Sequence, residues 1–268
     1  MVLCCEEKLV HYLGSLPLAT RILVIASIPA VMTALGTLPV LLGRRVGEKF
    51  LDAGLGFSAG VMLVASFTSL LLPAIDSGRL VSVYTGFVAG VLMILLLDKT
   101  IPHLHVMKGY EGPRGSGRAL KKVVLLVLAI MIHNIPEGMA VGVSTIYSIV
   151  DGLVIAIAIG LQDIPEGLAV ALPLYMVTRS PGKSIGIGVL SGLTELLAAY
   201  IPLGILVVFN ASTTTLLPFL MSLSAGAMIY VVVHEIIPEI YGHEHDEPST
   251  IGFFIGFLAM LLLDTLLG

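Results

Sequence analysis

Eight long apolar stretches run through this chain, and no other feature limits its fold as strongly. An α-helix needs ~20 mainly apolar residues to cross the ~30 Å hydrocarbon core of a bilayer, and each stretch is about that long. They occupy residues 21–42, 52–73, 81–98, 122–144, 151–174, 184–208, 215–240 and 250–267. Only 12% of the residues are charged, which is roughly half the usual share in a soluble domain. The sequence therefore predicts an all-α polytopic membrane protein, with residues 1–268 forming one bundle of eight transmembrane helices.

The longest connection between these stretches is residues 99–121, which we expect to be a flexible, histidine-containing cytoplasmic loop that separates three helices from five. Most of the 14 lysines and arginines lie in three alternate loops: Arg44, Arg45, Lys49, Lys99, Lys108, Arg114, Arg118, Lys121, Lys122, Arg179 and Lys183. Because positive charge favours cytoplasmic loops, both termini are expected on the extracytoplasmic side of a cell (inner or plasma) membrane.

The opening residues, "MVLCCEEKLVHYLGS", have no basic segment leading into an apolar core. We therefore do not interpret them as a cleaved signal peptide. Cys4 and Cys5 are the two cysteines of the chain, and we expect them in a loose terminus without a structural role. Lipidation is the alternative.

Two related polar motifs interrupt the apolar stretches: "HNIPEG" at 133–138 and "QDIPEG" at 162–167, offset by 29 residues. They lie on consecutive helices joined by a short turn at 147–151, so the two helices must run in opposite directions. Each motif is about ten residues, or ~15 Å, from that turn. The motifs are therefore predicted to meet near the middle of the bilayer.

Within each motif the glutamate lies between the two leading polar residues around the helix. At ~100° per residue, Glu137 is ~40° from His133, and Asn134 is ~100° from His133. Gln162, Asp163 and Glu166 repeat this arrangement. The pattern suits two adjacent cation sites that share the glutamates as bridges. Pro136 and Pro165 each free a helix carbonyl, which also indicates a polar cavity at this depth.

Glu195, in the stretch 184–208, is a further acidic residue at mid-depth. With Glu137, Asp163 and Glu166 it makes four carboxylates, whose charge two divalent cations would neutralise. A polar contact between helices would explain Asn134 or Gln162 taken alone, but not the whole set of acids.

Other candidate residues admit two interpretations. Asp98, His103, His105, His234 and Glu235, with Glu239, His243 and His245 nearby, are either polar residues at helix ends or weak metal-binding stops near a cytoplasmic exit. Ser69 and Asp76 either receive an arriving cation at the outer side or serve as helix caps or solubilising residues. Met62 is either core filler or a soft ligand that favours zinc, cadmium or copper over magnesium.

These residues resemble those of the ZIP (Zrt-/Irt-like) metal transporters, and most closely the prokaryotic GufA-like branch. "HNIPEG" is similar to the fourth-helix motif of the family and "QDIPEG" to its fifth-helix motif. The resemblance covers essentially the whole chain. It implies eight helices with external termini, metal import into the cytoplasm by an elevator-like movement, and a homodimer.

The resemblance also implies a two-metal transport site. The first metal would bind Met62, His133, Glu137, Gln162 and Glu166, and the second Asn134, Glu137, Asp163, Glu166 and Glu195. Asp98, His103, His105, His234 and Glu235 match the cytoplasmic exit of the family. Many eukaryotic members have His-Glu where this chain has Gln162-Asp163, and aspartate in place of Glu137, so their metal preferences are not transferred to it.

We therefore expect a transporter of divalent transition metals and not an enzyme. Zinc is the first expected substrate, with cadmium, iron or manganese as others. Imidazole, carboxylate and thioether ligands suit zinc and cadmium better than they suit calcium or magnesium, which prefer shells made only of oxygen. The expected partners are metal ions, the lipid bilayer and a second copy of the chain, with no nucleic acid and no catalytic cofactor. A membrane metallohydrolase is disfavoured, because Pro238 replaces the second histidine of an HExxH motif in "HEIIP". A metal-gated channel or a sensor stays open as an alternative.

Overall fold

The computed structural model describes residues 2–45, 48–100, 103–105, 109–111, 119–210, 213–240 and 246–267, nearly all of them helical. In chain order the elements are α1 (Val2–Ser15), α2 (Leu18–Gly36), η1 (Leu38–Arg45), α3 (Glu48–Ala65), η2 (Ser66–Leu71), α4 (Leu72–Asp76), α5 (Leu80–Thr100), β1 (His103–His105), β2 (Gly109–Glu111), α6 (Ala119–Tyr147), α7 (Ile149–Thr178), α8 (Pro181–Ala198), α9 (Ile201–Val208), α10 (Thr213–Val231), η3 (Val232–Ile236), α11 (Ile237–Ile240) and α12 (Asp246–Leu267). Of the η segments, η1 is a 3₁₀ helix, whereas η2 and η3 are π-helical.

Among the described residues, seven helical segments are long and apolar enough to cross a membrane. They are Leu18–Leu41, Lys49–Asp76, Leu80–Leu97, Ile149–Thr178, Pro181–Val208, Thr213–Ile236 and Glu247–Leu266. Each overlaps one of the predicted apolar stretches, so the prediction of an all-helical polytopic protein is confirmed. The remaining predicted stretch, 122–144, lies within the 29-residue helix α6.

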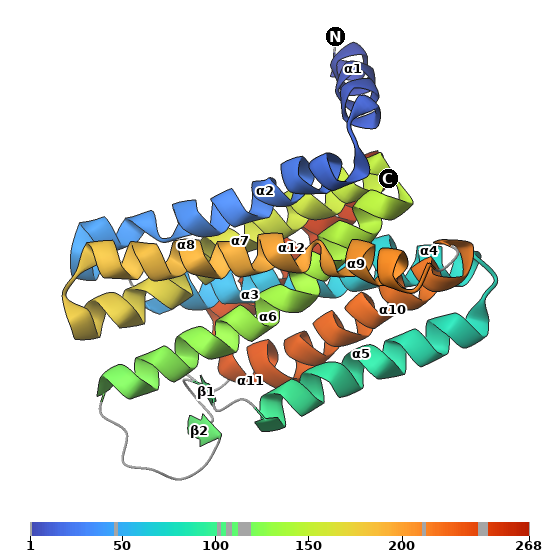
Figure 1. Cartoon of the computed structure of the whole chain (residues 1–268). Helices are drawn as coiled ribbons and strands as arrows, with labels where there is room; N and C mark the ends of the chain where they lie inside the picture. Colours follow the sequence, from blue (N-terminus) through green and yellow to red (C-terminus); the bar gives the residue numbers. More distant parts are fainter. Residues whose placement is uncertain are drawn as a thin grey trace.

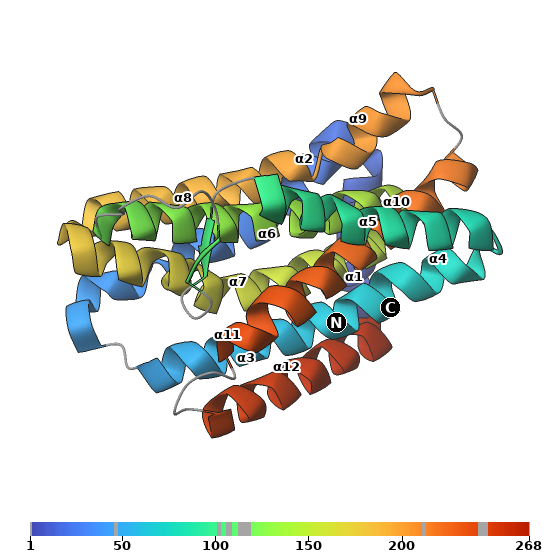
Figure 2. The same cartoon turned by 90° about the horizontal axis from the view of Figure 1, so that it is seen from below.

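The helices pack as one central group and two outer pairs. Helices α2, α6, α7 and α8 contact one another, whereas α3 pairs with α12 and α5 pairs with α10 (Figures 1 and 2). Within a pair the backbones touch: a Cβ atom at Gly56 of α3 would overlap the carbonyl oxygen of Ser249, at the start of α12. The outer pairs meet the central group where α3 packs on α7 and α10 packs on α6.

A single residue, Ser148, connects α6 to α7. Its backbone is extended, with φ of −152°, and its hydroxyl accepts a hydrogen bond from the Asp151 N–H at 3.4 Å, which caps α7. This tight reversal makes the two helices antiparallel neighbours. The middle of α6 therefore lies beside the middle of α7, where the two polar motifs are located.

The amino-terminal residues Val2–Ser15 form a helix, which the sequence did not predict. The side chain of Arg21 donates hydrogen bonds to the carbonyl oxygens of Leu13 at 3.1 Å and Gly14 at 3.2 Å, which holds the end of α1 against the start of α2. Helix α1 projects from the bundle at the end where α12 finishes (Figure 1). The side chains of Cys4 and Cys5 lie outside the described residues.

The long loop contains a short β-ribbon that the sequence did not predict. Strands β1 and β2 are antiparallel, with His103 opposite Glu111, and they lie near α11, toward the other end of the bundle from α1 (Figure 1). The loop residues 101–102, 106–108 and 112–118 lie outside the described part of the chain. The flexibility that we expect for this loop therefore stays a prediction.

Candidate metal centre

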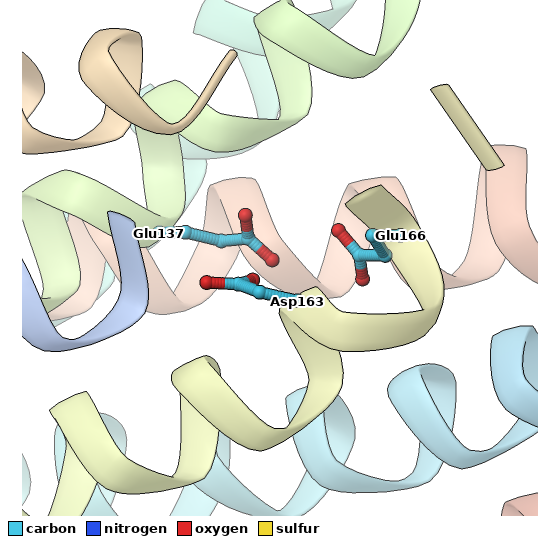
Figure 3. Close-up of side chains that lie close together, drawn as sticks. All are labelled: Glu137, Asp163 and Glu166. Carbon is cyan, nitrogen blue, oxygen red and sulfur yellow. The ribbon is translucent and has the colours of Figure 1, made fainter. Parts of the chain in front are cut away.

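Three carboxylates converge between the middle parts of α6 and α7. Glu137 comes from α6, Asp163 and Glu166 come from α7, and the three side chains point toward one another (Figure 3). Each offers an oxygen atom that lies within 4.8 Å of the other two. All three residues are buried. We call Glu137, Asp163 and Glu166 the carboxylate cluster.

The two amide side chains of the motifs are buried and form hydrogen bonds between helices. Gln162 Nε2 donates a hydrogen bond to Glu137 Oε1 at 2.5 Å, which links α7 to α6. Asn134 Nδ2 donates to the backbone oxygen of Ser191 on α8 at 3.1 Å and to its hydroxyl at 3.2 Å. The amide oxygens of both residues are buried and have no hydrogen-bond partner among the described residues. Each amide thus uses its nitrogen to hold its position and keeps its oxygen available.

Glu195 of α8 is the fourth acidic residue at this depth. It is 1% exposed, and its carboxyl group lies close enough to Asp163 for the two to interact electrostatically. Within the carboxylate cluster, one oxygen on each of Glu137, Asp163 and Glu166 lacks a hydrogen-bond partner among the described residues. Buried carboxylates in this state are costly. A bound divalent cation would supply the missing positive partner.

His133 adds an imidazole to the oxygen atoms of this region. Its Nε2 contacts Oε2 of Glu235, which is buried in the π-helical segment η3. We expected Glu235 near the cytoplasmic end of its helix, separate from the central motifs. The structure instead joins it directly to the first residue of "HNIPEG". A metal that binds His133 would therefore meet Glu235 as well.

Met62 lies on the α3 face that meets α7. It is 1% exposed and follows Ser58 by four residues, and the Ser58 hydroxyl donates to the backbone oxygen of Gln162 at 3.0 Å. In η2, which follows α3, Ser69 donates a hydrogen bond to Asp264 Oδ1 of α12 at 3.0 Å, whereas Asp76, at the end of α4, is exposed.

Of the remaining predicted exit residues, His234 is the one whose side chain the structure describes. His234 is exposed, and its ring centroid lies 4.9 Å from that of Tyr230. Asp98 lies on α5, and His103 and His105 lie on β1, but their side chains are outside the described part of the chain. Residues 241–245, which include His243 and His245, are also outside it.

Two serines support the site through hydrogen bonds that were not predicted from the sequence. Ser58 binds the backbone of Gln162, and Ser191 holds the amide of Asn134. Each precedes a candidate ligand by four residues, Ser58 before Met62 and Ser191 before Glu195. Residues four apart share a helix face, and this spacing is the signal that could have identified both.

Comparisons with known proteins found a matching family model and several similar transporters. A family model described as ZIP Zinc transporter matches residues 107–264. The zinc transporter ZIPB of Bordetella bronchiseptica is 43% identical, over 88% of this chain and 78% of that protein. The zinc transporter GufA of Myxococcus xanthus is 34% identical, over 92% and 98% of the two chains, and the human zinc transporter ZIP11 is 30% identical, over 88% and 94%.

Proposed function

The chain belongs to the ZIP family of zinc transporters, and from that premise we propose that it moves zinc into the cytoplasm through the carboxylate cluster. The observation that carries this proposal is the convergence of Glu137, Asp163 and Glu166 in the buried middle of the bundle. Acidic residues at such a depth are expensive and mark ion pathways. Transport, and not catalysis, is the role we assign to them.

We propose that two metal ions bind side by side. The ligands of the first are Met62, His133, Glu137, Gln162 and Glu166, and those of the second are Asn134, Glu137, Asp163, Glu166 and Glu195. The available amide oxygens of Asn134 and Gln162 support this assignment, as does the position of Glu195 beside Asp163. Two divalent ions would balance the four carboxylates. The same mixture of oxygen, nitrogen and sulfur ligands suits cadmium, iron(II) and manganese(II) to differing degrees.

The contact between His133 and Glu235 supports an exit route toward the cytoplasm. An ion bound at His133 could pass to Glu235 without leaving the protein, and then to the weaker sites at Asp98, His103, His105 and His234. We propose these residues as successive stops. Ser69 and Asp76 remain our candidates for the entrance.

We propose eight transmembrane helices, with α6 added to the seven segments that meet the criteria of length and hydropathy. An even number of crossings puts both termini on one side of the membrane. The start of α1 and the end of α12 lie toward the same end of the bundle, which supports this count (Figures 1 and 2). The loop at 99–121 is then cytoplasmic, and residues 1–268 form a single domain. A homodimer stays a prediction.

The grouping of the helices supports an elevator-type movement. The carboxylate cluster, Asn134 and Gln162 lie on α6 and α7 of the central group, and Glu195 lies on α8. Met62 lies on α3 of one outer pair, and Glu235 lies on η3, which follows α10 of the other. The central group could carry the metal past the outer pairs as one unit.

The proposal is tested by zinc uptake into sealed vesicles that contain the purified protein, with internal zinc read by a trapped dye. Wild type should give saturable uptake, and His133→Ala or Glu166→Ala should reduce it at least tenfold, about the effect of losing one ligand interaction. Glu247→Gln, which changes an exposed acid at the start of α12, is the control and should transport normally. Wild-type protein that binds zinc but moves none would overturn the transporter assignment.

A further inference from the structure

Two buried serine hydroxyls lie outside the metal centre and have no hydrogen-bond partner among the described residues: Ser144 of α6 and Ser224 of α10. Both side chains are fully buried. Their sequence neighbours behave differently, because Thr145 and Ser222 each donate to the carbonyl four residues earlier at 2.7 Å. Buried polar groups are nearly always satisfied, so an unsatisfied one calls for an explanation.

The two serines occupy corresponding positions on facing helices. His133 of α6 contacts Glu235, which follows α10, and these two helices pack together in opposite directions (Figure 1). Ser144 follows His133 by 11 residues, and Ser224 precedes Glu235 by 11 residues. That interval is about three helical turns, or ~16 Å. Both serines therefore lie at about the same level, on the side of the bundle where α6 turns into α7.

Ser144 also shares the helix face of the metal ligands. At ~100° per residue it lies ~20° from His133 around α6, and Glu137 lies ~40° from His133 in the same direction. Ser144 is thus seven residues, or ~10 Å, beyond Glu137 on the face that carries the ligands. In the proposed orientation this is the outer side of the site.

The π-helical segment η2 packs against α10 and α6 on this side. Such turns occur frequently at functional sites. The one at η3 carries Glu235 on the inner side of the cluster, and the one at η2 carries Ser69, which holds Asp264, on the outer side. The two π-helical segments therefore flank the cluster along the bundle axis.

We infer that the hydroxyl groups of Ser144 and Ser224 bind the metal transiently on its path between the outer surface and the carboxylate cluster. Their oxygens would replace part of the water shell of an incoming divalent cation, which is a hard-ligand role suited to transient binding. This inference rests on the proposed function, because it names residues that would line the outer half of the same transport path.

The first test compares uptake with equilibrium binding. Ser144→Ala combined with Ser224→Ala removes two hydroxyl contacts and should lower the initial rate of zinc uptake at least about fivefold, while zinc binding by the purified protein stays unchanged. The matched control is Ser222→Ala, whose hydroxyl is already paired within its own helix. Uptake equal to wild type in the double variant would overturn the inference while leaving the proposed function intact. If wild type itself moves no zinc, the proposed function and this inference are both wrong.

A second test does not depend on the alanine variants folding well. Ser144→Cys and Ser224→Cys are made separately in a chain with Cys4→Ser and Cys5→Ser, and a small charged thiol reagent is applied from outside during zinc transport. Both thiols should react, zinc at high concentration should slow the reaction, and Ser222→Cys should react at least about tenfold more slowly. Absence of reaction at both positions, or equal reaction at position 222, would overturn the inference.

Discussion

The hydrogen bond from Gln162 to Glu137 joins the two motifs, with the neutral amide of Gln162 as donor and the carboxyl group of Glu137 as acceptor. Gln162→Glu would remove the donor and bring another negative charge against Glu137. We expect the metal-free protein to unfold roughly 5 °C lower than wild type. Zinc should raise the unfolding temperature of the variant most of the way back to that of wild type, because a cation stabilises the folded state to which it binds. Thermal unfolding with and without zinc measures the effect, and an unchanged metal-free midpoint would show that this bond contributes little.

At the residue scale, the motifs were the most informative part of the sequence. Their spacing and their place on consecutive helices predicted that Glu137 and Glu166 would approach each other, because a short turn leaves the chain no other arrangement. The contact between His133 and Glu235 was not predictable in this way, since 102 residues separate the two and only the packing of α10 on α6 joins them. The bond from Asn134 to Ser191 depends in the same way on how α6 meets α8.

At the scale of helices, the placement of Glu195 depends on a close approach of α6 and α8. A Cβ atom at Gly138 would overlap the carbonyl oxygen of Glu195, and one at Gly142 would overlap that of Ala199. We expect Gly138→Ala to push the helices apart and to lower zinc affinity at least about tenfold, as in the displacement of a metal ligand. Zinc titration of the purified variant measures this change.

The control for that experiment is Gly186→Ala, in α8. A Cβ atom there would have no neighbour within 4 Å, and alanine favours a helix over glycine by about 0.5–1 kcal/mol. The control should therefore bind zinc normally and be at least as stable as wild type. Equal affinity in both variants would contradict the importance of the close approach.

The lengths of the apolar stretches predicted where the membrane-spanning helices lie, but they did not predict the irregularities within those helices. The predicted stretch 184–208 contains a break, with α8 ending at Ala198 and α9 beginning at Ile201, just before Pro202. The π-helical segments η2 and η3 add a residue to a turn without any clear mark in the sequence. Helix α1 was missed because its mixture of charged and apolar residues is too polar to signal a membrane crossing. Such features arise from tertiary packing and local capping.

At the scale of the whole molecule, the proposed topology predicts which surfaces face each side of a membrane. In sealed vesicles of known orientation, trypsin should cut the loop at 99–121 only from the cytoplasmic side, because Arg114 and Arg118 lie in it. Tags on the two termini should both be accessible from outside. Termini on opposite sides would mean an odd number of crossings and would remove α6, or another helix, from the list of spanning segments.

Equilibrium zinc binding to the purified protein tests the central claim most directly, because the whole account requires the carboxylate cluster to hold the metal. Wild type should bind two zinc ions per chain. Glu137→Gln, which alters a carboxylate proposed to bridge both ions, should lose tight binding of both, and Glu195→Gln should lose only one. If Glu137→Gln instead binds zinc with the wild-type stoichiometry and affinity, the metal is held elsewhere and the account is wrong.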